Sequence, residues 1–279
     1  MPLITSSSNP KIKDAVSLRE SKNRKETGLT IVEGYLEVKR ALACAFQFTE
    51  IFYCPALLKK YDDGKVLEQL QGQKARLFEV PESVFEKMAY GERQEGIIAV
   101  CKPKAYHLSD LNKMKRAHLM MVLESVEKPG NLGAVLRTCD AVGVDGVIVC
   151  DKKTDIFNPN VIRASLGTVF SIKTVACSND EALEFFKANK IQICAAFPDG
   201  KQIYSDTDLT SSTAMVMGTE HAGLSEFWMR HADLRVKIPM NGLADSLNVS
   251  VSAAVLLYEA LRQRSGHSKN HQPKTINQQ

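Results

Sequence analysis

From residue 118 onward, the sequence alternates regularly between short apolar runs and segments with helical or turn-like character. The strand-like runs are residues 119–123, 146–150, 170–175, 191–196, 214–217 and 234–238. Residues 179–188 and 225–230 are among the segments that separate them. Such alternation predicts an α/β fold with a mostly parallel sheet and helices on both faces, because parallel strands need crossover connections. Ligands of such sheets bind outside the carboxyl ends of the strands.

The first hundred residues indicate a second, smaller α/β unit. Strand-like runs at 29–32, 48–53, 75–80 and 96–101 alternate with helical segments at 36–45, 56–70 and 82–88. Residues 102–116 are polar and basic and contain Pro103, which is typical of a linker. The predicted domains are therefore residues 1–101, a basic linker at 102–117, a larger domain at 118–265 and a disordered polar tail at 266–279.

Charge is distributed unevenly along the chain. The net charge is +4, but residues 9–28, 101–118 and 262–279 carry +3, +4 and +4, so the remainder carries −7. Basic segments on an acidic body suggest a polyanionic partner such as RNA or DNA. Surface lysines and a basic tail that only aid solubility would give the same pattern, so charge alone leaves both interpretations open.

Cysteine usage and hydropathy indicate the cellular compartment in which the protein works. The seven cysteines include no Cys-x-x-Cys pair, which argues against a disulfide framework and a zinc site and predicts a reducing cytoplasm. No apolar run reaches the length that crosses a bilayer. The N-terminus lacks the basic-then-apolar order of a secretory signal. We therefore expect a cytoplasmic protein that has no membrane-spanning segment and binds no metal.

Polar loops follow three of the predicted strands, at residues 124–131, 218–223 and 241–248. In the first, the apolar residues after Asn131 share one helix face, and Arg137 lies about 160° from the centre of that face. In the simpler alternative, Asn131 only caps the helix and Arg137 is a solvated charge. The second loop has Leu224-Ser225 where a phosphate-binding loop needs Lys-Ser/Thr, which excludes that motif.

The third loop leads into residues 249–261, which are apolar almost all round. A helix of that kind is buried in a core or in a subunit interface. Ser246 or Asn248 can cap its N-terminus.

Three motifs taken together are more specific than any one of them. They are Asn131-x-Gly-x-x-x-Arg137, Gly218-x-Glu220-x-x-Gly223, and Ile238-Pro-Met240 followed by Ser246-Leu-Asn-Val-Ser250. Their order and spacing, from about residue 118 to residue 264, resemble the SpoU/TrmH-type family of RNA ribose 2'-O-methyltransferases in the SPOUT superfamily. The stretch Arg163-Ala-Ser-Leu-Gly167 fits a pattern found between the first two motifs.

The first hundred residues also resemble a substrate-binding domain often attached to these enzymes. That domain is of the ribosomal-protein, kink-turn-binding type. The matching residues are Ser8-Asn-Pro-Lys-Ile-Lys13, Arg24, Gly28 and Val32-Glu-Gly34. The RNA-binding candidates are therefore Lys11, Lys13, Arg24 and, from the larger domain, Arg163.

The resemblance implies a C-terminal trefoil knot and S-adenosylmethionine as cofactor. Residues carried over as cofactor contacts are Gly218, Ile238, Met240 and Leu247. Arg137 matches the essential arginine of the family. Because a guanidinium stays protonated in proteins, we expect Arg137 to grip the target phosphate and place the 2'-OH rather than act as the base. The residues expected to orient the ribose, the arginine and the loops are Asn131, Glu220, Ser246 and Asn248.

The expected function is site-specific methylation of a ribose 2'-OH in structured RNA by a homodimer that forms through the C-terminal helix. Ribosomal RNA is preferred over tRNA because the N-terminal domain type recognises folded RNA shape. The alternatives are a tRNA methyltransferase, a non-catalytic ribosome assembly factor, and a metabolic enzyme, which would not explain the basic segments. The family often has Asp at the positions of Glu124-Ser125 and Glu127-Lys128, and this difference makes the target nucleotide harder to assign. A role in antibiotic resistance stays open.

Overall fold

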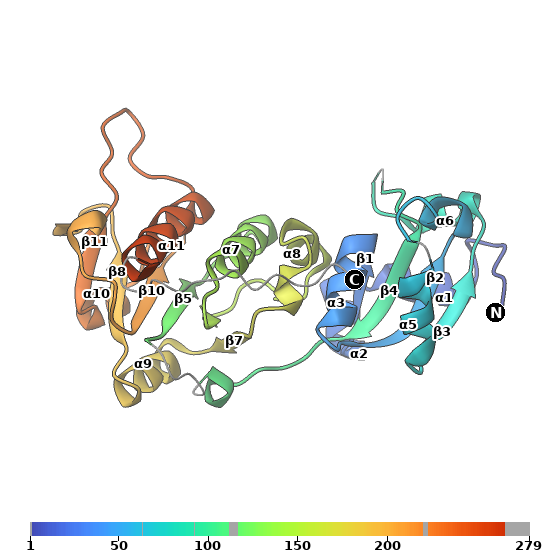
Figure 1. Ribbon diagram of the computed structural model, residues 1–279, viewed down its shortest axis with the longest axis horizontal. Helices are drawn as coiled ribbons and strands as arrows, with labels where there is room; N and C mark the ends of the chain where they lie inside the picture. Colours follow the sequence, from blue (N-terminus) through green and yellow to red (C-terminus); the bar gives the residue numbers. More distant parts are fainter. Residues whose placement is uncertain (1, 63, 92, 112–116, 220–222, 266–279) are drawn as a thin grey trace.

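The computed structural model describes residues 2–62, 64–91, 93–111, 117–219 and 223–265 (Figure 1). It contains a four-stranded sheet in the N-terminal part and a seven-stranded sheet in the C-terminal part, which lie side by side along the long axis. The N-terminal elements are α1 (Pro10–Ser17), α2 (Ser21–Thr27), β1 (Thr30–Glu33), α3 (Tyr35–Ala43), β2 (Gln47–Tyr53), α4 (Pro55–Leu58), α5 (Lys65–Gly72), β3 (Arg76–Glu79), α6 (Glu82–Met88) and β4 (Ile97–Lys102).

The smaller sheet has strand order β1-β4-β2-β3, with β2 and β3 parallel and the other pairs antiparallel. Successive side chains of each strand point to opposite faces. Ile31 and Ile98 pack with α1 and α6, whereas Val32 and Ile97 pack with α3 and α5. Helices therefore cover both faces of this sheet. Sequence periodicity did not predict α1 and α2; α1 is capped by Asn9, whose side chain accepts a hydrogen bond from the Lys11 N–H.

The larger sheet has strand order β7-β6-β5-β10-β8-β11-β9, and every described pair of neighbours is parallel. The predicted α/β class and parallel sheet are thus confirmed. The elements are η1 (Leu108–Leu111), β5 (Leu119–Glu124), α7 (Pro129–Val142), β6 (Gly146–Cys150), α8 (Pro159–Ala164), η2 (Thr168–Phe170), β7 (Thr174–Cys177), α9 (Asn179–Ala188), β8 (Gln192–Ala196), β9 (Gln202–Ile203), η3 (Tyr204–Asp206), β10 (Thr213–Met217), α10 (Glu226–His231), β11 (Leu234–Lys237) and α11 (Val249–Ser265).

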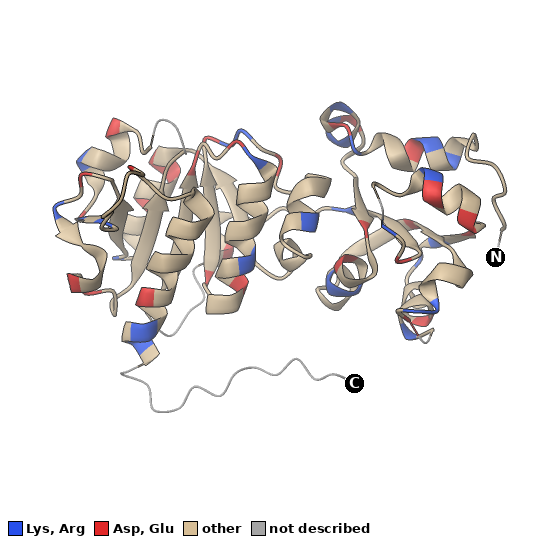
Figure 2. Cartoon of the chain, turned by 90° about the horizontal axis from the view of Figure 1, so that it is seen from above, with Lys and Arg blue, Asp and Glu red and all other residues tan. Residues whose placement is uncertain are grey.

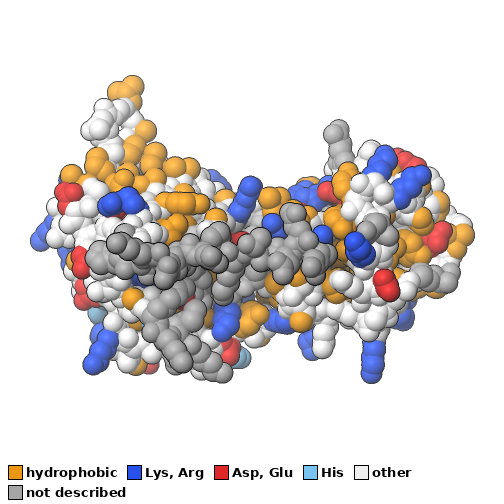
Figure 3. Space-filling view, in the orientation of Figure 1, with side chains coloured by type: hydrophobic (Ala, Val, Ile, Leu, Met, Phe, Trp, Pro, Cys, Tyr) orange, Lys and Arg blue, Asp and Glu red, His pale blue; other side chains and the backbone are white. Residues whose placement is uncertain are grey.

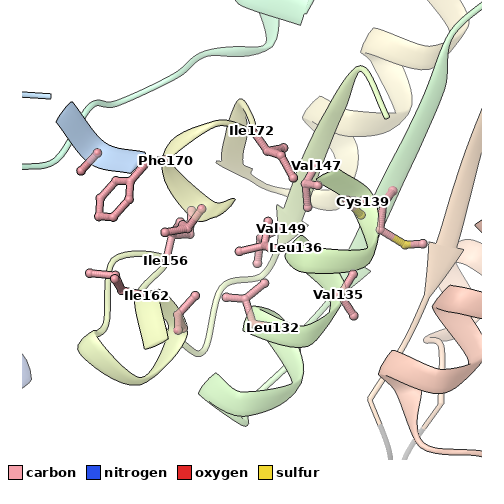
Figure 4. Close-up of a cluster of buried hydrophobic side chains, with 14 of the residues drawn as sticks. Leu132, Val135, Leu136, Cys139, Val147, Val149, Ile156, Ile162, Phe170 and Ile172 are labelled. Carbon is pink, nitrogen blue, oxygen red and sulfur yellow. The ribbon is translucent and has the colours of Figure 1, made fainter. Parts of the chain in front are cut away.

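Burial on both faces explains why these strands are apolar throughout. Helices α7, α8 and α11 cover one face, and α9 and α10 cover the other. Most charged residues lie on helices and loops, and the central strands of the larger sheet are apolar (Figure 2). Figure 4 shows the layer between the sheet and α7, where Leu132 and Leu136 meet Val149. Among the described residues, no helix combines the length and apolar character required for a membrane span.

Two details differ from the sequence predictions, and a third concerns the expected subunit interface. The run 170–175 is not one strand: η2 ends at Phe170, and β7 begins only at Thr174. Helix α7 begins at Pro129, a favoured first helical residue, so Asn131 lies inside the first turn and does not cap the helix. Helix α11 is buried on one side only, because Val251 and Tyr258 are exposed in the single chain.

The two parts of the chain share a continuous apolar core. The ring of Phe46 lies 4.8 Å from that of Phe170, centroid to centroid. Beside it, Arg24 is buried, and its Nε donates a hydrogen bond of 2.7 Å to Asp155. Its NH1 donates to the carbonyls of Leu18 and Arg19. The structure therefore gives Arg24 a role in joining the two parts, while a contact between Arg24 and RNA remains a prediction.

Substitution of Arg24 by Ala should lower the free energy of unfolding by about 2 kcal/mol, because it leaves Asp155 and two carbonyls without their donor. Chemical denaturation would measure the change. Lys22→Ala is the control, since its pair with Glu26, at 3.9 Å, is exposed, and the loss should stay within about 0.5 kcal/mol. Normal stability combined with weakened RNA binding would favour the RNA-contact role.

Candidate active site

A cavity of about 430 Å³ lies at the carboxyl ends of β8, β10 and β11. The residues predicted to contact the cofactor all line it: Gly218, Ile238, Met240 and Leu247. Ser246 lines it as well. Ligands of parallel sheets bind at this edge, and a site of this size suits a small molecule. The second and third polar loops therefore meet in one cavity, while the cofactor roles of these residues remain predictions.

Gly218 lets two backbone segments approach closely at the floor of this cavity. A Cβ atom at this position would lie 2.0 Å from the Gly223 carbonyl oxygen. The loop also closes on itself, since the Thr219 N–H donates to Gly223 at 3.0 Å and the Gly223 N–H returns a bond of 3.1 Å. The side-chain positions of Glu220 and His221, between these residues, lie outside the described part of the chain.

Asn248 connects the third loop to the first. Its Oδ1 accepts hydrogen bonds from the Ser250 N–H at 2.9 Å and Ser250 Oγ at 2.7 Å, which caps α11. Its Nδ2 donates to Asn131 Oδ1 at 3.3 Å. Of the two cap candidates predicted from the sequence, the structure thus selects Asn248. The predicted orienting residues Asn131 and Asn248 are in contact, although their separation in sequence is 117 residues.

Asn131 presents a further donor at the same place. Its Nδ2 is buried and has no hydrogen-bond partner within the described part of the protein. A buried donor in this state costs free energy unless a bound group accepts from it. This buried donor therefore favours a ligand or substrate group that accepts a hydrogen bond near the first loop.

Arg137 is not among the residues that line the cavity. It is exposed on α7, as its position opposite the apolar face predicted. It lies six positions beyond Asn131 on the helix, a rise of about 9 Å. In the single chain Ser246 lines the cavity and Asn131 contacts Asn248 beside it, whereas Arg137 lies further along α7.

Glu124 is a residue of this region to which the sequence argument gave no role. It is buried at the end of β5 and accepts hydrogen bonds from the Ser225 N–H at 2.8 Å and from Ser225 Oγ at 2.6 Å. It also accepts from Asn179 Nδ2 at 2.8 Å. These bonds fix the end of the loop that begins at Gly218. The only sign of this role in the sequence was an acidic residue directly after an apolar strand. Its partner, Ser225, is 101 residues further along the chain.

Comparison with known proteins agrees with this geometry. Residues 118–258 match the SpoU rRNA Methylase family, and residues 9–99 match the MRM3-like substrate binding domain. The chain belongs to the SpoU rRNA Methylase family. It is 30% identical to 23S rRNA (guanosine(2553)-2'-O)-methyltransferase RlmP of Bacillus subtilis, over 92% of this chain and 98% of that protein.

Solved structures of SpoU methyltransferases share the fold over nearly the whole chain. The AdoMet-bound rRNA methyltransferase from Sinorhizobium meliloti superposes with a TM-score of 0.85 at 28% identity, covering 93% of this chain and 97% of that one. The SpoU methyltransferase AviRb from Streptomyces viridochromogenes, in complex with AdoMet, gives 0.82 at 26% identity and covers 92% and 100%.

The cavity fits S-adenosylmethionine, the cofactor of this family. Ile238, Met240 and Leu247 give the cavity an apolar lining of the kind that suits an adenine ring, and main-chain groups approach closely at Gly218. Ser246 and Asp199 add polar groups to the lining. The donor set and the shape are therefore consistent with a cofactor that is part aromatic and part charged.

Gly218→Ala should abolish S-adenosylmethionine binding, because the new methyl group would overlap the Gly223 backbone and force the loop open. Isothermal titration calorimetry with the intact protein measures the affinity. Gly72→Ala is a matched control, since an added Cβ there meets nothing within 4 Å. Undiminished binding by Gly218→Ala would mean that the cofactor lies elsewhere.

Glu124→Gln should weaken S-adenosylmethionine binding about tenfold. The amide replaces one carboxylate oxygen, which accepts hydrogen bonds from Ser225 or Asn179, with an NH2 group that can only donate. The expected change is a higher KM for the cofactor together with a small fall in melting temperature. Exposed Glu184 on α9, changed to Gln, controls for the loss of charge. A fall in melting temperature with a normal KM would show that Glu124 serves only the fold.

Proposed function

We propose that this enzyme transfers a methyl group from S-adenosylmethionine to a ribose 2'-OH of large-subunit ribosomal RNA. The observation that carries the proposal is the meeting of the three predicted loops: the cavity joins the second and third, and the bond between Asn131 and Asn248 joins the third to the first. RlmP, whose name gives 23S rRNA as its target, aligns over 92% of the chain, which favours rRNA over tRNA. Other relatives are named tRNA/rRNA methyltransferases, so a tRNA target is the alternative.

The same proposal extends to the domain roles. Residues 1–101 form the RNA-binding domain, residues 102–117 the linker and residues 118–265 the methyltransferase domain. The match of residues 9–99 to a substrate binding domain supports this division. A mixed four-stranded sheet with helices on both faces supports the ribosomal-protein type. Lys13 is exposed on α1, whereas Lys11 is held by Glu50 at 2.9 Å, so Lys13 is the better RNA contact of the two.

We also propose that the C-terminal segments form the trefoil knot of the family. Strand β10 lies between β5 and β8, and β8 lies between β10 and β11, so late segments of the chain occupy the interior of the sheet. The loops that follow β10 and β11 line the same cavity. A knotted path would hold both loops around the cofactor without help from charged side chains.

When bound, S-adenosylmethionine supplies a methyl group already activated by its sulfonium. The protein has to hold the ribose in line with that methyl and to ease removal of the 2'-OH proton. Arg137 grips the target phosphate through paired N–H groups and stabilises charge as the proton leaves. Asn131, Ser246 and Asn248 orient the ribose and the loops, and Glu220 is assigned the same task.

The position of Arg137 outside the cavity supports a homodimer. Helix α11 carries Val251, Val255 and Tyr258 at helical spacing, with Val251 48% and Tyr258 51% exposed. Figure 3 shows hydrophobic side chains gathered over α11 and the loop before it. We propose that this face pairs two subunits and that Arg137 of each completes the cavity of the other.

A mixture of Arg137→Ala and Gly218→Ala subunits tests this arrangement. Each variant alone should be inactive, and Arg137→Ala should bind S-adenosylmethionine normally. Subunits exchanged at equal ratio should regain about a quarter of wild-type methyl transfer, because half of the dimers hold one complete site of two. Transfer of labelled methyl to 23S rRNA measures it. No recovery in proven mixed dimers would place Arg137 in its own subunit's site.

Comparing 2'-O-methyl positions in total RNA from cells with and without this protein decides the target. Loss of one large-subunit rRNA position is the expected result, and it would be consistent with a cytoplasmic enzyme. Loss of a tRNA position would select the alternative substrate. Identical maps, together with no methyl transfer in vitro, would favour a non-catalytic assembly factor.

A further inference from the structure

A second, smaller cavity lies at the junction between the two parts of the chain. Its volume is about 100 Å³, and its lining includes Arg19, Glu33, Tyr90 and Arg93 from the N-terminal part. Asn160 and Arg163 of α8 line the opposite side, where α8 packs beside β1. A space of this size corresponds to about three water molecules, so it takes a compact group and not a whole nucleobase.

Two of the arginines in this cavity are held by buried carboxylates. Arg19 Nε donates to Glu33 at 2.9 Å, and Arg93 donates through NH1 and NH2 to Glu37 at 3.1 Å. Glu95 lies 4.0 Å from Arg93. These pairs fix the two guanidinium groups in place and offset much of their charge.

Arg163 is held differently. Its guanidinium carbon lies 4.4 Å from the centre of the Tyr90 ring, and its NH2 donates to Asn160. Within the described part of the chain, no ion pair with a carboxylate is recorded for it. A guanidinium stacked on a ring keeps its edge N–H groups pointing sideways, where they match two oxygens of a phosphate.

We propose that this cavity binds one backbone phosphate of the RNA substrate, with Arg163 as the principal contact. The inference rests on the proposed function, because it assumes an RNA substrate. Phosphate contacts fix the register of a strand without reading its sequence. Since both parts of the chain line the cavity, a phosphate held there sets the path by which RNA passes from the substrate-binding part to the methyltransferase part.

Arg163→Ala tests the proposal in the full-length protein. Filter binding with transcribed 23S rRNA, over a series of KCl concentrations, should show about tenfold weaker affinity and a salt slope smaller by roughly one. Affinity for S-adenosylmethionine and melting temperature should stay at wild-type values. Arg230→Ala is the matched control, because Arg230 is exposed and paired with Glu226 on α10.

Substitutions at Tyr90 separate stacking from charge. Tyr90→Phe keeps the ring and should bind rRNA normally, whereas Tyr90→Ala should weaken binding because Arg163 is no longer held flat. Unchanged affinity and slope for Arg163→Ala, in a preparation whose wild type methylates rRNA, would overturn the phosphate site and leave the methyltransferase intact. Parallel losses of RNA binding, cofactor binding and melting temperature would overturn it too, since Arg163 would then only hold α8 in place. A wild type that neither retains nor methylates the transcript would remove the proposed function and this inference together.

Discussion

The arrangement of the site depends on the hydrogen bonds of one side chain, that of Asn248. Its Oδ1 caps α11, and its Nδ2 reaches Asn131 near the start of α7. The cap satisfies N–H groups at the start of a long helix, which fixes where the third loop must end. The bond to Asn131 then ties the end of that loop to α7, against which α11 also packs.

The close packing at Gly218 has a similar effect on the second loop. Its backbone touches that of Gly223, and the far end of the loop is held by Glu124. A cavity bounded in this way is shaped by main-chain atoms and buried bonds, and few charged side chains are required. This agrees with a cofactor site built mainly from main-chain and apolar groups.

Two features of the single chain lie on its exposed surface. Arg137 is exposed on α7, and the outer side of α11 presents Val251 and Tyr258 to solvent. In the proposed dimer, both features have a partner. The RNA would then contact the substrate-binding part, the junction at Arg163 and the cavity of a site built from two chains.

Local patterns in the sequence were enough to predict most elements of the larger sheet. Apolar runs buried on both faces predicted its parallel strands, and polar loops after three of them predicted the edge at which a ligand would bind. It also placed Arg137 on the outer side of its helix, because helical geometry depends only on spacing. The cavity residues Gly218, Ile238, Met240 and Leu247 were identified through family motifs, not through periodicity.

Which distant groups meet became known from the tertiary structure alone. Arg24 pairs with Asp155 across the two parts of the chain, and Glu124 accepts from Ser225. Neither pairing leaves a periodic trace in the sequence, because each joins residues on separate elements whose approach is set by packing of the whole core. The same reason explains the junction cavity at Arg163, which exists only because α8 docks beside β1.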